Sequence, residues 1–171
     1  KKVVVDQTIS GINFLMKKNN ISVYNGLGSF IDSTHINIQG EKKIIIEAKN
    51  TIIATGSKPS SLPFISLDKE RIITSTEALE LKEIPKHLII IGGGVIGLEL
   101  GQVYKRLGAE VSVIEYADRI TPLMDSSLSR ELMKVLKKQK INFYLSHKVN
   151  NVLRKGKNIK VTATDKNDNE V

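Results

Sequence analysis

The residues with the clearest chemical meaning are glycines that follow an apolar run, in the segment LIIIGGGVIGLELG at residues 88–101. Gly92, Gly94 and Gly97 match the pattern G-x-G-x-x-G, after an expected buried strand and at the start of an expected helix. The first glycine permits a tight turn, the second lets a pyrophosphate approach the backbone, and the third lets the helix pack closely on the strand. The phosphates would meet free N–H groups at the positive end of the helix dipole. The spacing therefore predicts a dinucleotide site.

A carboxylate completes this pattern at the end of the next expected strand. Glu115 closes the run EVSVIE, 18 residues after Gly97. A carboxylate at this place accepts hydrogen bonds from the two ribose hydroxyls and repels a 2′-phosphate, which favours NAD over NADP. A glycine-rich structural turn would explain the glycines but would leave this acid without a role.

Glu99 is a second acid, and it stands inside the apolar stretch that follows the glycines. Two interpretations are open on the residues alone. A negative charge near a helix N-terminus stabilises the helix. Alternatively, Glu99 faces the binding crevice and helps to orient a nicotinamide ring.

The pattern around these residues predicts a doubly wound, Rossmann-like α/β unit from residue 86 onward. Apolar runs at 87–91, 110–115 and 141–145 predict parallel strands, separated by helices that end near residue 107 and span 126–139. This order fits right-handed crossovers, and the segments KVNNVLR and NIKVTAT predict an antiparallel pair that follows. The residues expected to face the core from the two helices are Ile96, Leu100, Val103, Leu107, Leu128, Leu132, Val135 and Leu136.

Residues 1–85 have a different pattern. Apolar residues at helical spacing (Ile9, Ile12 and Met16) predict an amphipathic helix over 6–19. The short runs ISVY, SFI, INI and KIIIE, separated by glycines, predict a small antiparallel β meander. TIIATGS predicts a further strand that stops at residues 55–57, before a proline-containing segment. A short helix over 75–81 precedes Pro85, where we expect the boundary between two domains, 1–85 and 86–171.

Composition excludes several classes of site. The chain has no cysteine, so it offers no thiolate nucleophile and no zinc–thiolate site. Its three histidines lie far apart without a metal-binding spacing, and we expect no metal. A net charge of +8 suggests nucleic acid, but the basic residues are scattered and aromatic residues are only 5%. A solvated lysine-rich surface is the favoured interpretation; a non-catalytic nucleic-acid module is the competing one.

The ends of the sequence indicate part of something longer. The chain begins KKVVVDQTIS, without an initiator Met or a signal-peptide layout. No apolar run approaches the roughly 20 residues that span a bilayer, so we expect no membrane association.

Over nearly its whole length the chain resembles the dihydrolipoamide dehydrogenases of the pyridine nucleotide–disulfide oxidoreductase family. The resemblance is carried by YNGLGSF, TIIATGSKPSSLPFI, ITSTEALELKEIPKHLIIIGGGVIGLELGQVYKRLGAEVSVIEY and PLMDSSLSRELMKVLKKQKINF. It implies a flavoenzyme with FAD-binding, NAD-binding and dimer-interface domains. Such an enzyme oxidises dihydrolipoyl groups and passes two electrons through a redox disulfide to FAD and then to NAD+.

The resemblance also implies roles for individual residues. Glu99 is implied to lie beside the junction of nicotinamide and flavin, Glu115 at the ribose and Val149 at the adenine. The residues implied for FAD are Gly28, Thr55, Gly56 and Ser57. The residues implied for NAD are Gly92, Gly93, Gly94, Val95, Ile96, Gly97, Leu98, Glu99, Glu115 and Val149.

Two parts of the family's machinery are expected outside this chain: the redox cysteine pair before residue 1, and the His–Glu acid–base pair after residue 171. The resemblance thus implies a central fragment that cannot turn over alone. It combines the C-terminal part of an FAD-binding domain (1–85) with an incomplete NAD-binding domain (86–171).

Alternatives within the family stay open, among them mercuric reductases, NADH oxidases and other NAD(P)H-dependent disulfide reductases. Reductases of the glutathione type would be expected to use NADP, and they usually carry alanine where Gly97 stands. The implied partner is the dihydrolipoyl group of a 2-oxoacid dehydrogenase complex, and the implied full-length protein is a homodimer. The implied location is the mitochondrial matrix, with the plastid and the bacterial cytoplasm as alternatives.

Overall fold

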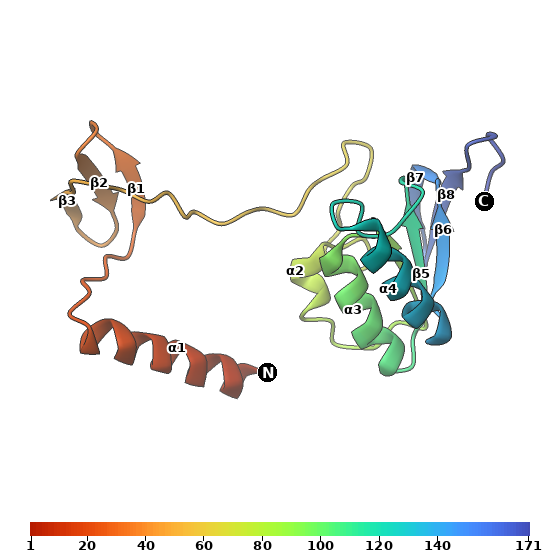
Figure 1. The fold of residues 1–171 in the computed structure, drawn as a ribbon, viewed down its shortest axis with the longest axis horizontal. Helices are drawn as coiled ribbons and strands as arrows, with labels where there is room; N and C mark the ends of the chain where they lie inside the picture. The colour runs from red at the N-terminus through yellow and green to blue at the C-terminus, as the bar shows by residue number, and fades with distance from the viewer. The chain divides into compact units, whose positions relative to one another are not determined.

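The computed structural model describes all residues, 1–171, and divides into two compact units, Lys1–Gly56 and Ser57–Val171 (Figure 1). The first unit contains a helix and a three-stranded antiparallel sheet. Its elements are α1 (Lys2–Lys18), β1 (Leu27–Phe30), β2 (His35–Gln39) and β3 (Lys43–Glu47). No helix of the chain is both long and apolar enough to cross a membrane.

Helix α1 confirms the amphipathic helix predicted for residues 6–19, and it begins earlier, at Lys2. Lys17 and Lys18 lie in its last turn, where positive charge interacts favourably with the helix dipole. The helix buries no residue, and Ile9 and Ile12 on its apolar face remain about half exposed, 51% and 50%. The periodicity therefore correctly predicted a helix, although nothing in the first unit covers its apolar face.

The β meander is confirmed for three of its four predicted runs. Strands β1, β2 and β3 pair in sequence order, with Ile36 opposite Phe30 on one side and Ile46 on the other. Gly26 lies so close to β2 that a Cβ atom would come within 2.7 Å of the Gln39 carbonyl oxygen. The run ISVY is not a strand, contrary to prediction, because no neighbouring strand pairs with it.

The second unit is the predicted doubly wound α/β unit. Its parallel sheet has the order β4–β5–β6, and an antiparallel hairpin follows in the sequence. The strands are β4 (His87–Ile91), β5 (Glu110–Glu115), β6 (Asn142–Leu145), β7 (Lys148–Lys155) and β8 (Asn158–Thr164). The helices are α2 (Ser75–Ala78), α3 (Val95–Arg106) and α4 (Ser126–Lys138).

Strand β5 is buried on both faces, whereas β4, for which the continuous apolar run predicts this, is only partly buried. Val111 and Val113 pack with Leu98 of α3 and Leu136 of α4 in one hydrophobic cluster. On the opposite face, Ile114 packs in a second cluster, whose other buried members come from the hairpin: Val149, Val152 and Ala163. Figure 1 shows α3 and α4 on one side of the parallel sheet and β7–β8 on the other. The sheet is therefore the middle layer of this unit.

The predicted core faces of the two helices need correction. In α3 the buried residues are Leu98, Gly101 and Tyr104, whereas Ile96, Val103 and Leu107 are at least half exposed. The reason is that Gly97 and Gly101 face Ile90 of β4 and let the helix lie close to the sheet. This contact turns the more apolar stripe outward. The face of α3 that packs on the sheet is thus selected by small residues rather than by large ones.

In α4 the prediction was half right. Leu136 is fully buried and Leu132 is partly buried, but Leu128 and Val135 are 57% and 50% exposed. The buried face of α4 instead includes Ser129, whose hydroxyl hydrogen-bonds to Thr121 in the loop that precedes the helix.

Residues 48–74 contain no strand, so the strand predicted for TIIATGS is wrong for this structure. Ile52 and Ile53 are 92% and 71% exposed, because no strand of the chain supplies their backbone hydrogen bonds. Residues 57–85 pack with the second unit, through Ile65, Ile72 and Ala78 among others. The assignment of residues 1–85 to an FAD-binding domain stays a prediction.

Candidate functional site

The glycine loop lies at the carboxyl ends of β4 and β5, where ligands bind in open parallel sheets. Ile91 pairs with Ile114 at the end of the two strands, and the Gly92 N–H donates to the Ile114 carbonyl oxygen at 2.8 Å. This bond extends the ladder by one residue and places the loop directly beside Glu115. Residues that are far apart in the sequence thus meet at one edge of the sheet, as the spacing predicted.

Each glycine of the fingerprint has a separate structural reason. Gly92 has φ +103°, a conformation that side chains disfavour, and this lets the chain turn out of β4. Gly94 has an ordinary φ of −76°, yet a Cβ atom there would meet nothing within 4 Å. Gly97 is the opposite case, because its Cβ would come within 2.9 Å of the Gly92 carbonyl oxygen. Thus Gly94 leaves open space in front of the loop, and Gly97 allows the helix to approach the strand.

Helix α3 presents free donors to this space. The first bond of the helix runs from the Leu98 N–H to the Gly94 carbonyl oxygen, 3.1 Å long. The N–H groups of Gly94, Val95, Ile96 and Gly97 donate to no group of the protein. Unpaired N–H groups at a helix N-terminus, with the positive end of the dipole behind them, form a site for anionic groups. The loop can therefore hold a phosphate without any basic side chain.

The Glu115 carboxylate points at the glycine loop. Its Oε2 atom accepts from the Gly93 N–H at 2.5 Å and its Oε1 atom accepts from the Ala117 N–H at 2.7 Å. The residue is only 9% exposed, and it forms no ion pair. Each oxygen uses one of two lone pairs for these bonds, so each can accept one more hydrogen bond. The geometry fits two adjacent hydroxyl groups, as in a ribose.

The segment after β5 supports the loop from its other side, which no pattern of residues predicted. The Thr121 N–H donates to the Gly93 carbonyl oxygen at 2.8 Å, and Ile120 beside it is fully buried. The Thr121 hydroxyl in turn hydrogen-bonds to Ser129 of α4 at 2.9 Å. Backbone hydrogen bonds of this kind depend on the tertiary path of the chain, and no residue type marks them.

The other residues predicted for NAD are spread over different environments. Val95 and Ile96 are exposed on the first turn of α3, whereas Leu98 belongs to the core. Val149 is 7% exposed and packs with Ile114 under the hairpin, so its predicted contact with adenine stays a prediction. Glu99 is exposed in the second turn of α3, and its side chain forms no hydrogen bond or ion pair. The interaction with the helix dipole falls off beyond the first turn, so it stabilises the helix little at this position, and the role of Glu99 at the nicotinamide stays a prediction.

The residues predicted for FAD are divided between the two units: Gly28, Thr55 and Gly56 belong to the first and Ser57 to the second. Gly28 lies in β1, and Thr55, Gly56 and Ser57 lie in the exposed segment between the two units. Gly56 has φ +76°, a left-handed conformation that favours glycine. Their assignment stays a prediction. Two cavities of about 360 and 130 Å³ are formed by residues of the second unit and involve none of them.

Comparison with known proteins gives the relatives of this chain. The family model described as pyridine nucleotide-disulphide oxidoreductase matches residues 3–171. The chain is 46% identical over 140 residues to dihydrolipoyl dehydrogenase of Trypanosoma brucei brucei, covering 81% of this chain and 29% of that protein. It is 41% identical over 166 residues to mitochondrial dihydrolipoyl dehydrogenase of Pisum sativum, covering 95% and 33%. The chain thus spans about a third of the length of these relatives.

Solved structures of similar proteins share the fold of this chain. LpdA of Mycobacterium tuberculosis superposes with a TM-score of 0.83 at 26% identity, over 99% of this chain and 38% of that one. RclA of Escherichia coli, a flavoprotein disulfide reductase induced by HOCl, gives a TM-score of 0.71 at 26% identity, over 92% and 38%.

Proposed function

The chain belongs to the pyridine nucleotide–disulphide oxidoreductase family, and on that basis we propose that it is the central part of an NAD-dependent dihydrolipoyl dehydrogenase. In this proposal residues 86–171 hold NAD, and residues 1–85 complete part of an FAD-binding domain. Relatives named dihydrolipoyl dehydrogenase, 41–46% identical over most of the chain, support it. The redox disulfide and the acid–base pair belong to other parts of the whole protein.

One observation carries the NAD part of the proposal: the Glu115 carboxylate is hydrogen-bonded to the N–H of Gly93 in the glycine loop. Bound NAD and FAD would supply the two-electron chemistry. The residues of this chain would bind and orient the nucleotide. The free N–H groups of residues 94–97 hold the pyrophosphate, and Glu115 accepts hydrogen bonds from the ribose hydroxyls. Glu99, exposed and unpaired on α3, would orient the nicotinamide.

We expect the chain to bind NADH more tightly than NADPH, by at least about tenfold, which is about 1.4 kcal/mol. The reason is that the 2′-phosphate of NADPH would meet the buried negative charge of Glu115, and no basic side chain pairs with that carboxylate. The measurement is a titration that follows the fluorescence of the reduced nicotinamide. A preference for NADPH would contradict the assignment of Glu115.

The activity itself is tested on the full-length protein. We expect it to reduce NAD+ with dihydrolipoamide as electron donor. The likeness to RclA supports one alternative, another flavoprotein disulfide reductase or an NADH oxidase of the same family. Oxidation of NADH by a disulfide substrate or by oxygen, with no turnover of dihydrolipoamide, would favour that alternative.

The remaining parts of the proposal concern partners and location. We propose that the full-length protein is a homodimer that oxidises the dihydrolipoyl group of a 2-oxoacid dehydrogenase complex. We place it in the mitochondrial matrix, since relatives from Pisum sativum and Dictyostelium discoideum are named mitochondrial. A relative from Pseudomonas putida keeps a bacterial location as the alternative.

A further inference from the structure

The segment that enters the second unit, residues 57–74, has no regular structure but is attached at defined points. Residues 57–64 are exposed. Ile65 and Ile72 then pack, partly buried, against the cluster beneath the β7–β8 hairpin. Between these two apolar contacts the chain makes a tight loop, and this loop carries two acids, Asp68 and Glu70.

Asp68 closes this loop through its own side chain. Its Oδ1 atom accepts from the N–H groups of Glu70, Arg71 and Ile72 at 2.9, 2.8 and 2.8 Å. The Asp68 N–H donates to the Ile72 carbonyl oxygen at 3.0 Å, and Lys69 adopts φ +60°. These bonds close the loop and leave the second carboxylate oxygen of Asp68 free to face outward.

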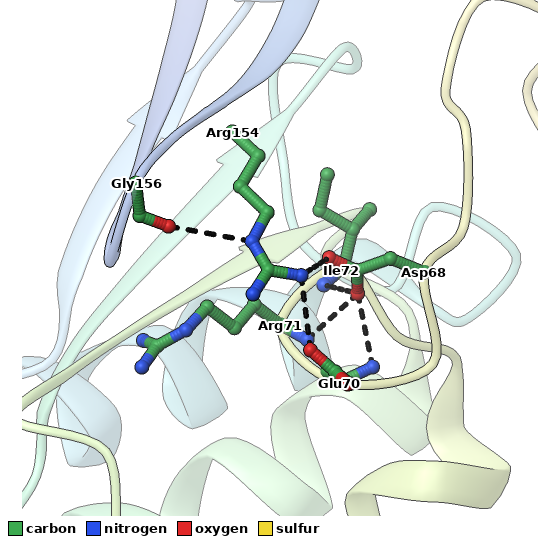
Figure 2. Close-up of polar contacts among 6 residues, drawn as sticks. All are labelled: Asp68, Glu70, Arg71, Ile72, Arg154 and Gly156. Atoms are coloured by element: carbon green, nitrogen blue, oxygen red, sulfur yellow. Dashed lines mark hydrogen bonds and ion pairs between the residues drawn. The ribbon is translucent and has the colours of Figure 1, made fainter.

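That second oxygen meets an arginine of the hairpin, as Figure 2 shows. The Arg154 Nη1 atom lies 2.8 Å from Asp68 Oδ2 and 3.0 Å from Glu70 Oε2. The Nε–H of Arg154 donates to the carbonyl oxygen of Gly156, at the hairpin turn, over 3.3 Å. This third bond orients the guanidinium toward the two acids. The contact joins parts of the chain that are more than 80 residues apart.

The electrostatics favour the paired state near neutral pH. Burial alone would raise the pKa of Asp68, but the three backbone N–H donors and Arg154 outweigh it and lower this pKa far below its ordinary value. A carboxylate whose pKa is depressed in the folded state contributes stability that is fully present at a pH above its ordinary pKa. This stability is lost only as the pH falls through the depressed pKa. The Asp68 and Arg154 side chains are 25% and 42% exposed, so salt can still screen the pair.

We propose that Asp68, Glu70 and Arg154 form an ionic latch that anchors the connecting segment, residues 57–74, to the tip of the β7–β8 hairpin. With the latch closed, the segment is held to the hairpin by the ion pairs as well as by Ile65 and Ile72. With the latch open, Ile65 and Ile72 alone hold the segment. In the proposed flavoprotein this segment belongs to the FAD-binding part, and the latch ties it to the NAD-binding part. That consequence rests on the proposed function, whereas the latch itself does not.

The test is limited trypsin digestion of the whole chain at low salt, with cleavage sites identified by mass spectrometry. Lys69 and Arg71 lie in the latched loop, whereas Lys49 lies in the exposed chain that precedes the segment and serves as the internal reference. We expect R154M to speed cleavage after Lys69 and Arg71 by about three- to tenfold relative to Lys49, because cleavage follows the population of the open state. In the unmodified chain, 1 M salt should raise the same ratio toward that of R154M.

Two further variants separate the latch from general loss of structure. D68N keeps the oxygen that closes the loop but presents an amide NH2 to Arg154, so it should digest like R154M. K155M removes the same charge from the neighbouring position, which has no contact with the acids, and should digest like the unmodified chain. Equal digestion of R154M and K155M would overturn the proposal, and so would a ratio that does not respond to salt. Neither result would affect the NAD-binding proposal, which is measured by nucleotide titration.

Discussion

Replacing Glu115 by Gln is expected to weaken NADH binding by about 1.5–3 kcal/mol, or about 10- to 150-fold, the range for hydrogen bonds that involve a charged group. Glu115 is placed to bind the ribose and already accepts from two backbone N–H groups, those of Gly93 and Ala117. Gln has a single acceptor oxygen, so its NH2 group must face one of these donors. The substitution therefore weakens the contact with the ribose and also disturbs the glycine loop.

The measurement is a titration with NADH by calorimetry or nicotinamide fluorescence, at one salt concentration. A matched control lies on the same strand: Glu110 is exposed at the opposite end of β5, and Glu110→Gln should leave the affinity unchanged. If Glu115→Gln binds NADH as well as the unmodified chain does, the carboxylate is not the ribose ligand. The NAD assignment would then lose its main support.

The parts of the fold that the sequence predicted are those set by local pattern. The run before Gly92 is continuous and apolar because both faces of the strand pack against hydrophobic clusters, and the structure confirms it as β4. The strand predicted for EVSVIE is confirmed as β5. The position of the glycine loop beside Glu115 was also predictable, since parallel strands end at the same edge of a sheet. The family itself was correctly identified from contiguous motifs.

The parts that could not be predicted depend on contacts between distant segments. Periodicity indicated that α3 has an apolar stripe, but the stripe that packs on the sheet contains Gly97 and Gly101 because only small residues fit against Ile90. The support of the loop by Thr121 uses backbone atoms, which have no sequence signature. The latch between Asp68 and Arg154 pairs two of many charged residues, and nothing in their types selects that pair. Composition and spacing show which residue types are available for such contacts, but they do not show which two residues meet.

The glycines of the loop allow ligand binding and folding to be separated. Gly94 has an ordinary backbone conformation and open space where a Cβ would lie. Gly94→Ala should therefore fold, with a stability change below about 1 kcal/mol for a changed helix cap. If the pyrophosphate lies against this backbone, the new methyl group occupies its place. We expect NADH affinity to fall by about 1–3 kcal/mol, the cost typical of overpacking, or about 5- to 150-fold.

Gly97→Ala should behave in the opposite way. Its methyl group would come within 2.9 Å of the Gly92 carbonyl oxygen and of Ile90, so α3 must move away from β4. We expect a loss of about 1–3 kcal/mol in unfolding free energy, measured by urea denaturation, with a smaller loss of NADH affinity than Gly94→Ala causes. The two variants change the chain by the same single methyl group, and only its position differs. If Gly94→Ala binds NADH normally while Gly97→Ala is destabilised, the loop has its predicted structure but the pyrophosphate lies elsewhere.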